Sequence, residues 1–164
     1  MKRLFSILAT FVLALTATSC ENHSDMIVDW TPLIIRVYVQ DTQGNDLLDP
    51  TNYRFMASEV SAEWRGTTSS YTYPGEIPPY HQTRAYFPHF EGVFLSQNAK
   101  GHYIYFGELM GNGDYNDDLI IHWNDGSKDV IHINNKANER TLKVKRSYTL
   151  NGKKCDNPIV ITRK

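Results

Sequence analysis

Apolar and polar residues alternate along much of the chain after residue 30, which is the pattern of strands with one buried face. The clearest example is the segment 33–40, in which every second residue is apolar: Leu33, Ile35, Val37 and Val39. Further strands are predicted over 53–60, 91–96 and 102–107. Beyond the N-terminal segment, no stretch keeps apolar residues at helical spacing for ten residues, so we expect strands and no helix.

Two hairpins are predicted from turn residues that separate apolar runs. In residues 118–134 the pair Asp125-Gly126 lies between two β-branched segments, and Gly accepts the positive φ of a tight turn. Both arms are apolar on both faces, which predicts a central place in a sheet covered by a second layer. The last hairpin is expected over 141–163, with Asn151-Gly152 beginning the reversal and 158–162 returning.

These elements predict an all-β fold. We expect an antiparallel β-sandwich of seven to nine strands, immunoglobulin-like or transthyretin-like, formed as a single domain by residues 30–164. The length of 164 residues and the 41% hydrophobic content are sufficient for one core. The 17 basic and 18 acidic residues carry no sign of the basic patch that nucleic acid requires, so no nucleic-acid partner is expected.

The first 19 residues have the pattern of a signal peptide. Two basic residues precede a mostly apolar run over 4–15, and small residues follow. The run is too short for a transmembrane helix, which needs about 20 apolar residues. We therefore expect residues 1–19 to be removed on export.

The small residues lead into Cys20, and this changes the expectation from secreted to anchored. The run 17–20 (ATSC) resembles a bacterial lipobox, in which the Cys thiol is acylated, although Ala17 replaces the usual Leu. Two or three acyl chains are sufficient for stable anchoring. We predict lipidation of Cys20, a tether over 20–29, and attachment to the outer membrane on its periplasmic or surface side. The alternative is ordinary cleavage that leaves Cys20 as a free thiol.

Cys155 is the only other cysteine. If Cys20 carries lipid, Cys155 has no partner, and we expect a free thiol in a terminal loop. The alternative is a bridge between Cys20 and Cys155 in a product without lipid. Neither residue has the spacing of a zinc or redox motif.

Residues 111–118 (GNGDYNDD) resemble a calcium loop, but two of its requirements fail. Asp117 occupies the position that needs Gly, and Trp123 the position that needs Glu. We expect a polar turn and no metal or cofactor. A two-residue loop at Asp125-Gly126 would pair His122 with Asp129 and place His122 and His132 on opposite faces, which also argues against a metal shared by these histidines.

The segment 64–90 is unusually rich in aromatic residues with interleaved prolines. Exposed Tyr and Trp surfaces suit binding of glycans or peptides, and long ordered loops are often functional. The alternative is a Pro-stiffened loop that packs its rings over one end of the sandwich. The candidate ligand-binding aromatics are Trp64, Tyr71, Tyr73, Tyr80 and Tyr86.

Several motifs resemble known proteins. The segment 37–47 (VYVQDTQGNDL) resembles the opening of many transthyretin-like and immunoglobulin-like bacterial domains. With 30–32 (WTP), 44–50 (GNDLLDP), 105–109 (YFGEL) and 125–129 (DGSKD), the chain is similar to a group of small uncharacterised lipoproteins of gut Bacteroides-like bacteria. The resemblance covers most of the mature chain, implies a lipid-anchored β domain in the outer envelope, and carries no known catalytic residues.

Two function classes follow from these observations. The first is a lipid-anchored, non-catalytic binding or accessory module of the cell envelope, with a glycan or protein ligand. The second is a small envelope hydrolase acting on glycan or peptide. A concave site with two carboxylates, or a His–carboxylate pair with a strongly perturbed pKa, would favour the hydrolase.

Overall fold

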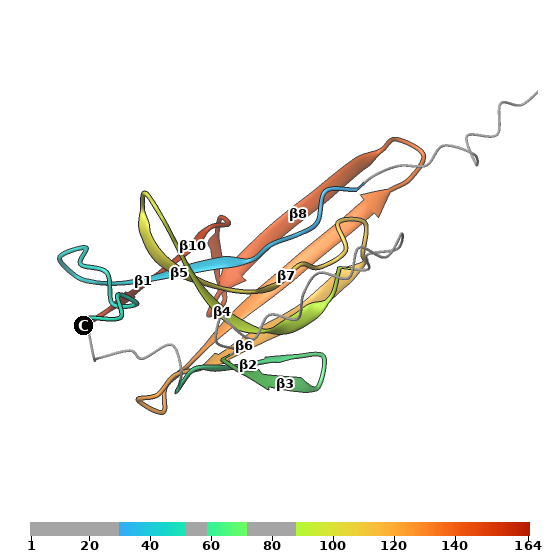
Figure 1. Ribbon diagram of the computed structural model, residues 1–164. Coiled ribbons are helices and arrows are strands. Elements are labelled where there is room, and N and C mark those ends of the chain that lie inside the picture. Colours follow the sequence, from blue (N-terminus) through green and yellow to red (C-terminus); the bar gives the residue numbers. More distant parts are fainter. Residues whose placement is uncertain (1–29, 52–58, 72–87) are drawn as a thin grey trace, which may run out of the picture.

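The computed structural model describes residues 30–51, 59–71 and 88–164, and within them it contains ten strands and no α-helix (Figure 1). The count exceeds the expected seven to nine because two very short strands, β3 and β9, lack an alternating apolar pattern. The strands are β1 (Arg36–Asp41), β2 (Ser61–Trp64), β3 (Thr67–Ser70), β4 (Phe90–Asn98), β5 (Gly101–Gly107), β6 (Tyr115–His122), β7 (Lys128–Asn138), β8 (Lys143–Leu150), β9 (Lys153–Cys155) and β10 (Ile159–Arg163).

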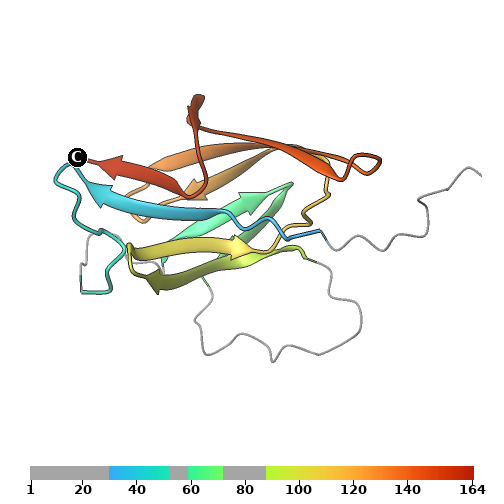
Figure 2. The same ribbon diagram turned by 90° about the horizontal axis from the view of Figure 1, so that it is seen from above.

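The strands form two sheets that pack face to face, which confirms the predicted all-β sandwich (Figure 2). One sheet has four strands in the order β10-β1-β5-β4, and the other has six in the order β3-β2-β6-β7-β8-β9. Neighbouring strands are antiparallel with one exception, the parallel pair of β1 and β10. The first and last strands of the domain are therefore neighbours.

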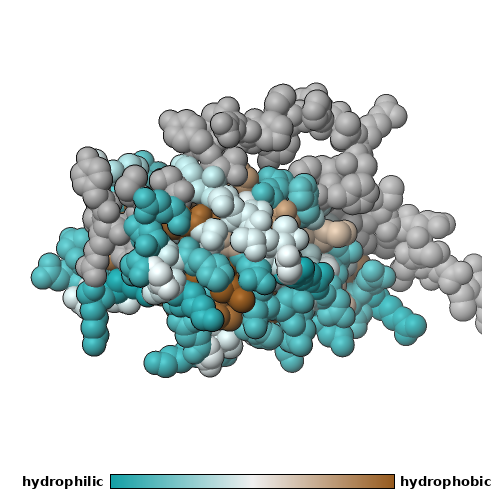
Figure 3. All heavy atoms as spheres, turned by 90° about the horizontal axis from the view of Figure 1, so that it is seen from below, coloured by the Kyte–Doolittle hydropathy of each residue, from teal (hydrophilic) through white to brown (hydrophobic). Residues whose placement is uncertain are grey.

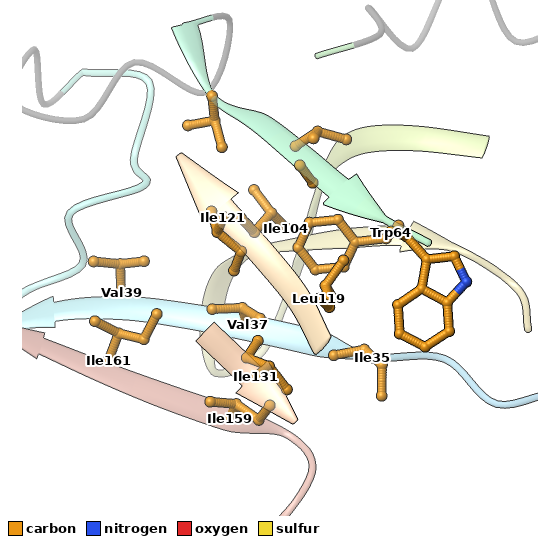
Figure 4. Packing of buried hydrophobic residues seen from close by; sticks show 14 of the residues in the cluster. Ile35, Val37, Val39, Trp64, Ile104, Leu119, Ile121, Ile131, Ile159 and Ile161 are labelled. Atoms are coloured by element: carbon orange, nitrogen blue, oxygen red, sulfur yellow. The ribbon is translucent and has the colours of Figure 1, made fainter. Parts of the chain in front are cut away.

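The core fills the space between the sheets, and the period-two pattern of the sequence explains its composition. Every second residue of the segment 33–39 is buried, as predicted, with at most 2% of each side chain exposed. These residues meet the inward-facing positions of the second sheet and of β10 (Figure 4). Among the labelled residues are Val37 of β1, Ile121 of β6, Ile131 of β7 and Ile159 of β10.

The hairpin predicted over 118–134 is formed by β6 and β7, and both strands are central in the six-stranded sheet, as expected. Its register, however, differs by one residue from the prediction. The amide of Trp123 donates to the carbonyl of Ser127 at 2.9 Å, so three residues, not two, form the loop. Gly126, with φ +80°, is the left-handed residue that ends this type of loop.

The last segment corrects the second predicted hairpin. Residues 151–152 do reverse the chain between β8 and β9, but β9 ends at Cys155. The chain then crosses to the other sheet, where Ile159 pairs in parallel with Val37. The Asn157 side chain fixes this crossing: its Nδ2 donates to the carbonyl of Ile34 at 2.7 Å, and its Oδ1 accepts from the amide of Arg36 at 3.1 Å.

The remaining strand predictions have mixed outcomes. The strands expected over 91–96 and 102–107 are confirmed as β4 and β5. The strand expected over 53–60 falls mostly outside the described residues. At its described end Glu59 and Val60 precede the strand, which begins at Ser61.

Candidate binding surface

The predicted signal peptide, the lipidated Cys20 and the tether all precede residue 30 and lie outside the described residues. In the part of the chain that the structure describes, no helix is long and apolar enough to cross a membrane. The anchor therefore stays a prediction from the sequence.

Of the candidate aromatics of the segment 64–90, the structure describes only Trp64 and Tyr71. Trp64 is the last residue of β2 and belongs to the core, with 6% of its side chain exposed. Tyr71 is half-buried and packs against the same core. Tyr73, Tyr80 and Tyr86 lie outside the described residues. The burial of Trp64 corrects its assignment as a ligand-binding ring.

Trp64 is held in the core by a group that the sequence did not reveal. Its ring and that of Tyr115 form a T-shaped pair with a centroid distance of 5.8 Å. The guanidinium of Arg65 lies over both rings, 5.6 Å from the centroid of Trp64 and 5.1 Å from that of Tyr115. Arg65 itself has a φ of +49° and forms, with Gly66, the tight turn between β2 and β3. Burial raises the pKa of the Tyr115 hydroxyl.

The polar segment 111–118 is used for internal contacts. Arg65 Nε donates to Asp117 Oδ2 at 3.0 Å, and Arg65 Nη2 donates to the carbonyl of Asp114 at 3.2 Å. The hydrogen bond from Arg65 to Asp117 lowers the pKa of the Asp117 carboxyl. The side chain of Asn116 accepts from Asn134 at 3.1 Å. Within the described residues, no three His, Cys, Asp or Glu side chains form a group suited to a metal ion.

A different aromatic group crosses the outer face of the four-stranded sheet. Its residues alternate with the buried Val37, Ile104 and Phe106, so they point away from the core. The ring centroid of Tyr103 lies 5.5 Å from that of Tyr38 and 6.1 Å from that of Tyr105. The ring centroid of Tyr105 lies in turn 5.2 Å from that of Phe94. The tyrosines are half-buried, whereas the last ring, that of Phe94, is 6% exposed and stacks on its neighbour. We call this group the aromatic row: Tyr38, Tyr103, Tyr105 and Phe94.

Polar side chains accompany the aromatic row. The guanidinium of Arg36 lies 5.8 Å from the ring centroid of Tyr103. Asn98 Nδ2 donates to the hydroxyl oxygen of Tyr38 at 2.7 Å and so fixes that ring at its polar end. Flat rings with nearby donors and acceptors, held on the rigid strands β1, β4 and β5, can stack against one face of a ligand and hydrogen-bond to its edge.

The aromatic row could not be predicted from the sequence, because its members are separated along the chain. The available signal was the opposite side of the alternating pattern: Arg36 and Tyr38 lie between the apolar residues of one strand, and Tyr103 and Tyr105 between those of another. Only the pairing of β1 with β5 brings these residues together. Seen from below, the described surface is mainly hydrophilic with small hydrophobic patches (Figure 3).

The histidine prediction is corrected by the observed register of the β6–β7 hairpin. His132 pairs with Asp118 and His122 with Lys128, so both histidines lie on the same outer face of the six-stranded sheet. They are four pairs apart, which corresponds to about 13 Å along the strands. His132 Nδ1 lies 2.8 Å from Asp118 Oδ1, and 38% and 55% of these side chains are exposed. This pair lies on an open sheet face rather than in the concave site that a hydrolase would need.

Cys155 forms no disulfide with any described residue, and it belongs to β9 rather than to the terminal loop that the sequence predicts. Its thiol is half-buried against the core, and this burial raises its pKa.

Comparison with known proteins leaves this description unchanged. No protein-family model matches the chain, and no curated protein or solved structure is detectably similar to it.

Proposed function

We propose that this chain is a lipid-anchored protein of the outer membrane whose β-sandwich is a non-catalytic binding module. The anchoring is supported by the signal-peptide pattern over 1–19 and by the small residues that lead into Cys20. The resemblance to Bacteroides-type lipoproteins agrees with this localisation. Within the described residues, the aromatic row is the feature that supports binding.

We propose an envelope glycan as the ligand of the aromatic row. A sugar ring has an apolar C–H face and a polar edge of hydroxyl groups. The rings of Tyr38, Tyr103 and Tyr105 supply flat apolar area, and their hydroxyls, with Arg36, supply hydrogen-bonding groups at its border. Tyr gives such contact area at small entropy cost, because only two side-chain torsions are fixed.

The anchor is tested by the substitution Cys20→Ala. We expect an unprocessed precursor, or loss of the protein from the membrane fraction, together with loss of labelling by palmitate. The control is Cys155→Ala, which removes the other thiol and should leave processing and labelling unchanged. Normal processing and continued membrane attachment of the Cys20→Ala protein would show that no lipid is attached at this residue.

The binding surface is tested by the double substitution Tyr38→Ala/Tyr103→Ala on an array of bacterial and host polysaccharides. Each lost stacking ring is expected to cost about 1 kcal/mol of binding, so the double variant should bind more than tenfold more weakly. The control Tyr38→Phe/Tyr103→Phe keeps both rings and should retain most of the affinity. The glycan assignment would be overturned if the Ala variant bound as tightly as the natural chain. It would also be overturned if the protein bound only a protein ligand and no polysaccharide.

A further inference from the structure

The β7–β8 hairpin extends beyond the rest of its sheet. β6 begins at Tyr115, which pairs with Asn135 of β7, so the last three residues of β7 have no β6 partner. These residues pair only with the start of β8, as in the pairs Ala137–Val144 and Asn138–Lys143. The hairpin therefore ends in an arm, residues 136–145, that projects from the sandwich (Figures 1 and 2).

This arm is strongly basic. The segment 135–146 contains five basic residues and one acidic residue, a net charge of 5 − 1 = +4, whereas the whole chain carries −1. The remainder of the chain therefore has a formal charge of −1 − 4 = −5. Arg146 is engaged by the side chain of Asn135 and the carbonyl of Gly111. The other four basic residues are exposed and make no ion pair with any described residue: Lys136, Arg140, Lys143 and Lys145.

Folding alone does not explain this arrangement. Lys136 and Lys145 are direct cross-strand partners in the antiparallel pair. Like charges directly opposite each other destabilise a sheet, so these lysines oppose the hairpin that carries them. A partner with negative charge would convert this repulsion into attraction.

The turn of the arm also exposes an apolar side chain. Leu142 is 46% exposed and has a φ of +52°, a left-handed conformation that is unfavourable for a residue with a bulky side chain. Thr141 and Arg140 beside it are exposed as well. An exposed apolar residue between Arg140 and Lys143 suits an anionic membrane surface, where cations meet the headgroups and an apolar group can enter the boundary region.

The chain enters the domain on the same side. Thr31 lies against Gly111, because a Cβ built on this glycine would come within 2.1 Å of the Thr31 carbonyl oxygen and 3.4 Å of Arg146 Nη2. Arg146 is the residue of β8 next to the arm. Figures 1 and 2 both show residues 30–35 beginning at the end of the sandwich from which the arm projects. Nine residues separate Cys20 from Trp30, and the ten steps between them reach at most about 36 Å.

We propose that the arm is a second contact with the membrane, in which Lys136, Lys145 and their basic neighbours bind the phosphate groups of anionic phospholipids. This inference rests on the lipid anchor of the proposed function. The short reach from Cys20 holds the arm near the bilayer. The arm then fixes the orientation of the sandwich, so that the anchored domain does not rotate freely on its tether.

The test uses the full lipidated chain in vesicles of phosphatidylcholine alone and of phosphatidylcholine with equimolar phosphatidylglycerol. The measurement is hydrogen–deuterium exchange of the backbone amides of residues 139–142. We expect exchange on the order of tenfold slower in the anionic vesicles, since each cation near such a surface adds measurable attraction. The variant Lys136→Gln/Lys145→Gln should lose this slowing. Because the variant removes a repulsive pair, its melting temperature should not fall.

The matched control is Lys153→Gln/Lys154→Gln, which removes the same charge from two exposed lysines. These lysines lie on β9, which pairs with the end of β8 that is farther from the arm. This variant should keep the slowed exchange. Equal exchange in the two vesicle types, or an equal loss in the control variant, would overturn the arm contact. If the chain sediments with neither vesicle type, the proposed anchor is wrong. If it sediments with both types but shows equal exchange, only the proposed arm contact is wrong.

Discussion

The two sheets of the sandwich are assembled from different kinds of strand pairing. In the six-stranded sheet, four of the five neighbouring pairs are hairpins between consecutive strands: β2–β3, β6–β7, β7–β8 and β8–β9. In the four-stranded sheet, only β4 and β5 are consecutive, and β1 pairs on one side with β5 and on the other with β10. The six-stranded sheet depends on local turns, and the four-stranded sheet depends on bringing the two ends of the domain together.

From this difference we expect contacts between the sheets to contribute more to the stability than contacts within one hairpin. Closing a long loop costs more entropy than closing a short one, so β10 must be held by strong long-range interactions. Some of these are apolar, as for Ile159 and Ile161 in the shared core. Another is polar: Arg163 of β10 donates to the buried carboxylate of Asp129 on β7.

Asp129→Ala should therefore have the largest effect on stability. The Asp129 carboxylate also accepts from Trp123 Nε1 and Asn151 Nδ2, each at 2.7 Å. Removing one partner of a buried ion pair leaves the other charge poorly compensated, and we expect a loss of about 3–5 kcal/mol in the free energy of unfolding. Urea unfolding followed by tryptophan fluorescence measures this loss.

The matched control for this prediction is Asp118→Ala. Asp118 lies on β6, is 55% exposed, and pairs with His132 on the outer face. Because exposed pairs contribute little, we expect a loss below about 1 kcal/mol. If the two substitutions cost the same, the contact between the sheets is no more important than a surface pair.

The same difference explains what the sequence could predict. The β6–β7 and β8–β9 reversals were predictable because Asp125-Gly126 and Asn151-Gly152 have turn chemistry that acts over a few residues. The register of the first hairpin was wrong by one, since the three-residue and two-residue loops share the same Asp-Gly signal. The parallel pairing of β1 with β10 has no local signal, so the last strand was assigned to the wrong sheet.

The proposed binding surface was harder to predict for the same physical reason. The density of aromatic residues over 64–90 is a local signal. It predicts Trp64 as a ligand-binding residue, whereas the structure places Trp64 in the core. The aromatic row instead depends on strands far apart in the sequence, as in the contact of Asn98 with Tyr38 across 60 residues. A binding surface on a sheet face is a property of strand order, which composition does not encode.

The smallest expected effect belongs to a contact within the six-stranded sheet, between the β2–β3 turn and β6. The hydrogen bond from Arg65 lowers the pKa of the Asp117 carboxyl, so this contact stabilises the fold fully above the unfolded-state pKa of about 3.9 and is lost as the pH falls through the folded-state value. Because both side chains are partly exposed, we expect Asp117→Asn to cost only about 0.5 kcal/mol at pH 7. The difference from the natural chain should shrink as the pH falls through the folded-state pKa of Asp117, as urea unfolding at pH 7 and at acidic pH would show. Asp114→Asn is the control: Arg65 hydrogen-bonds to the backbone carbonyl of Asp114, so this substitution removes a nearby charge but no hydrogen bond, and it should cost less than Asp117→Asn. A loss as large as that of Asp129→Ala would contradict the greater contribution of contacts between the sheets to the stability of the fold.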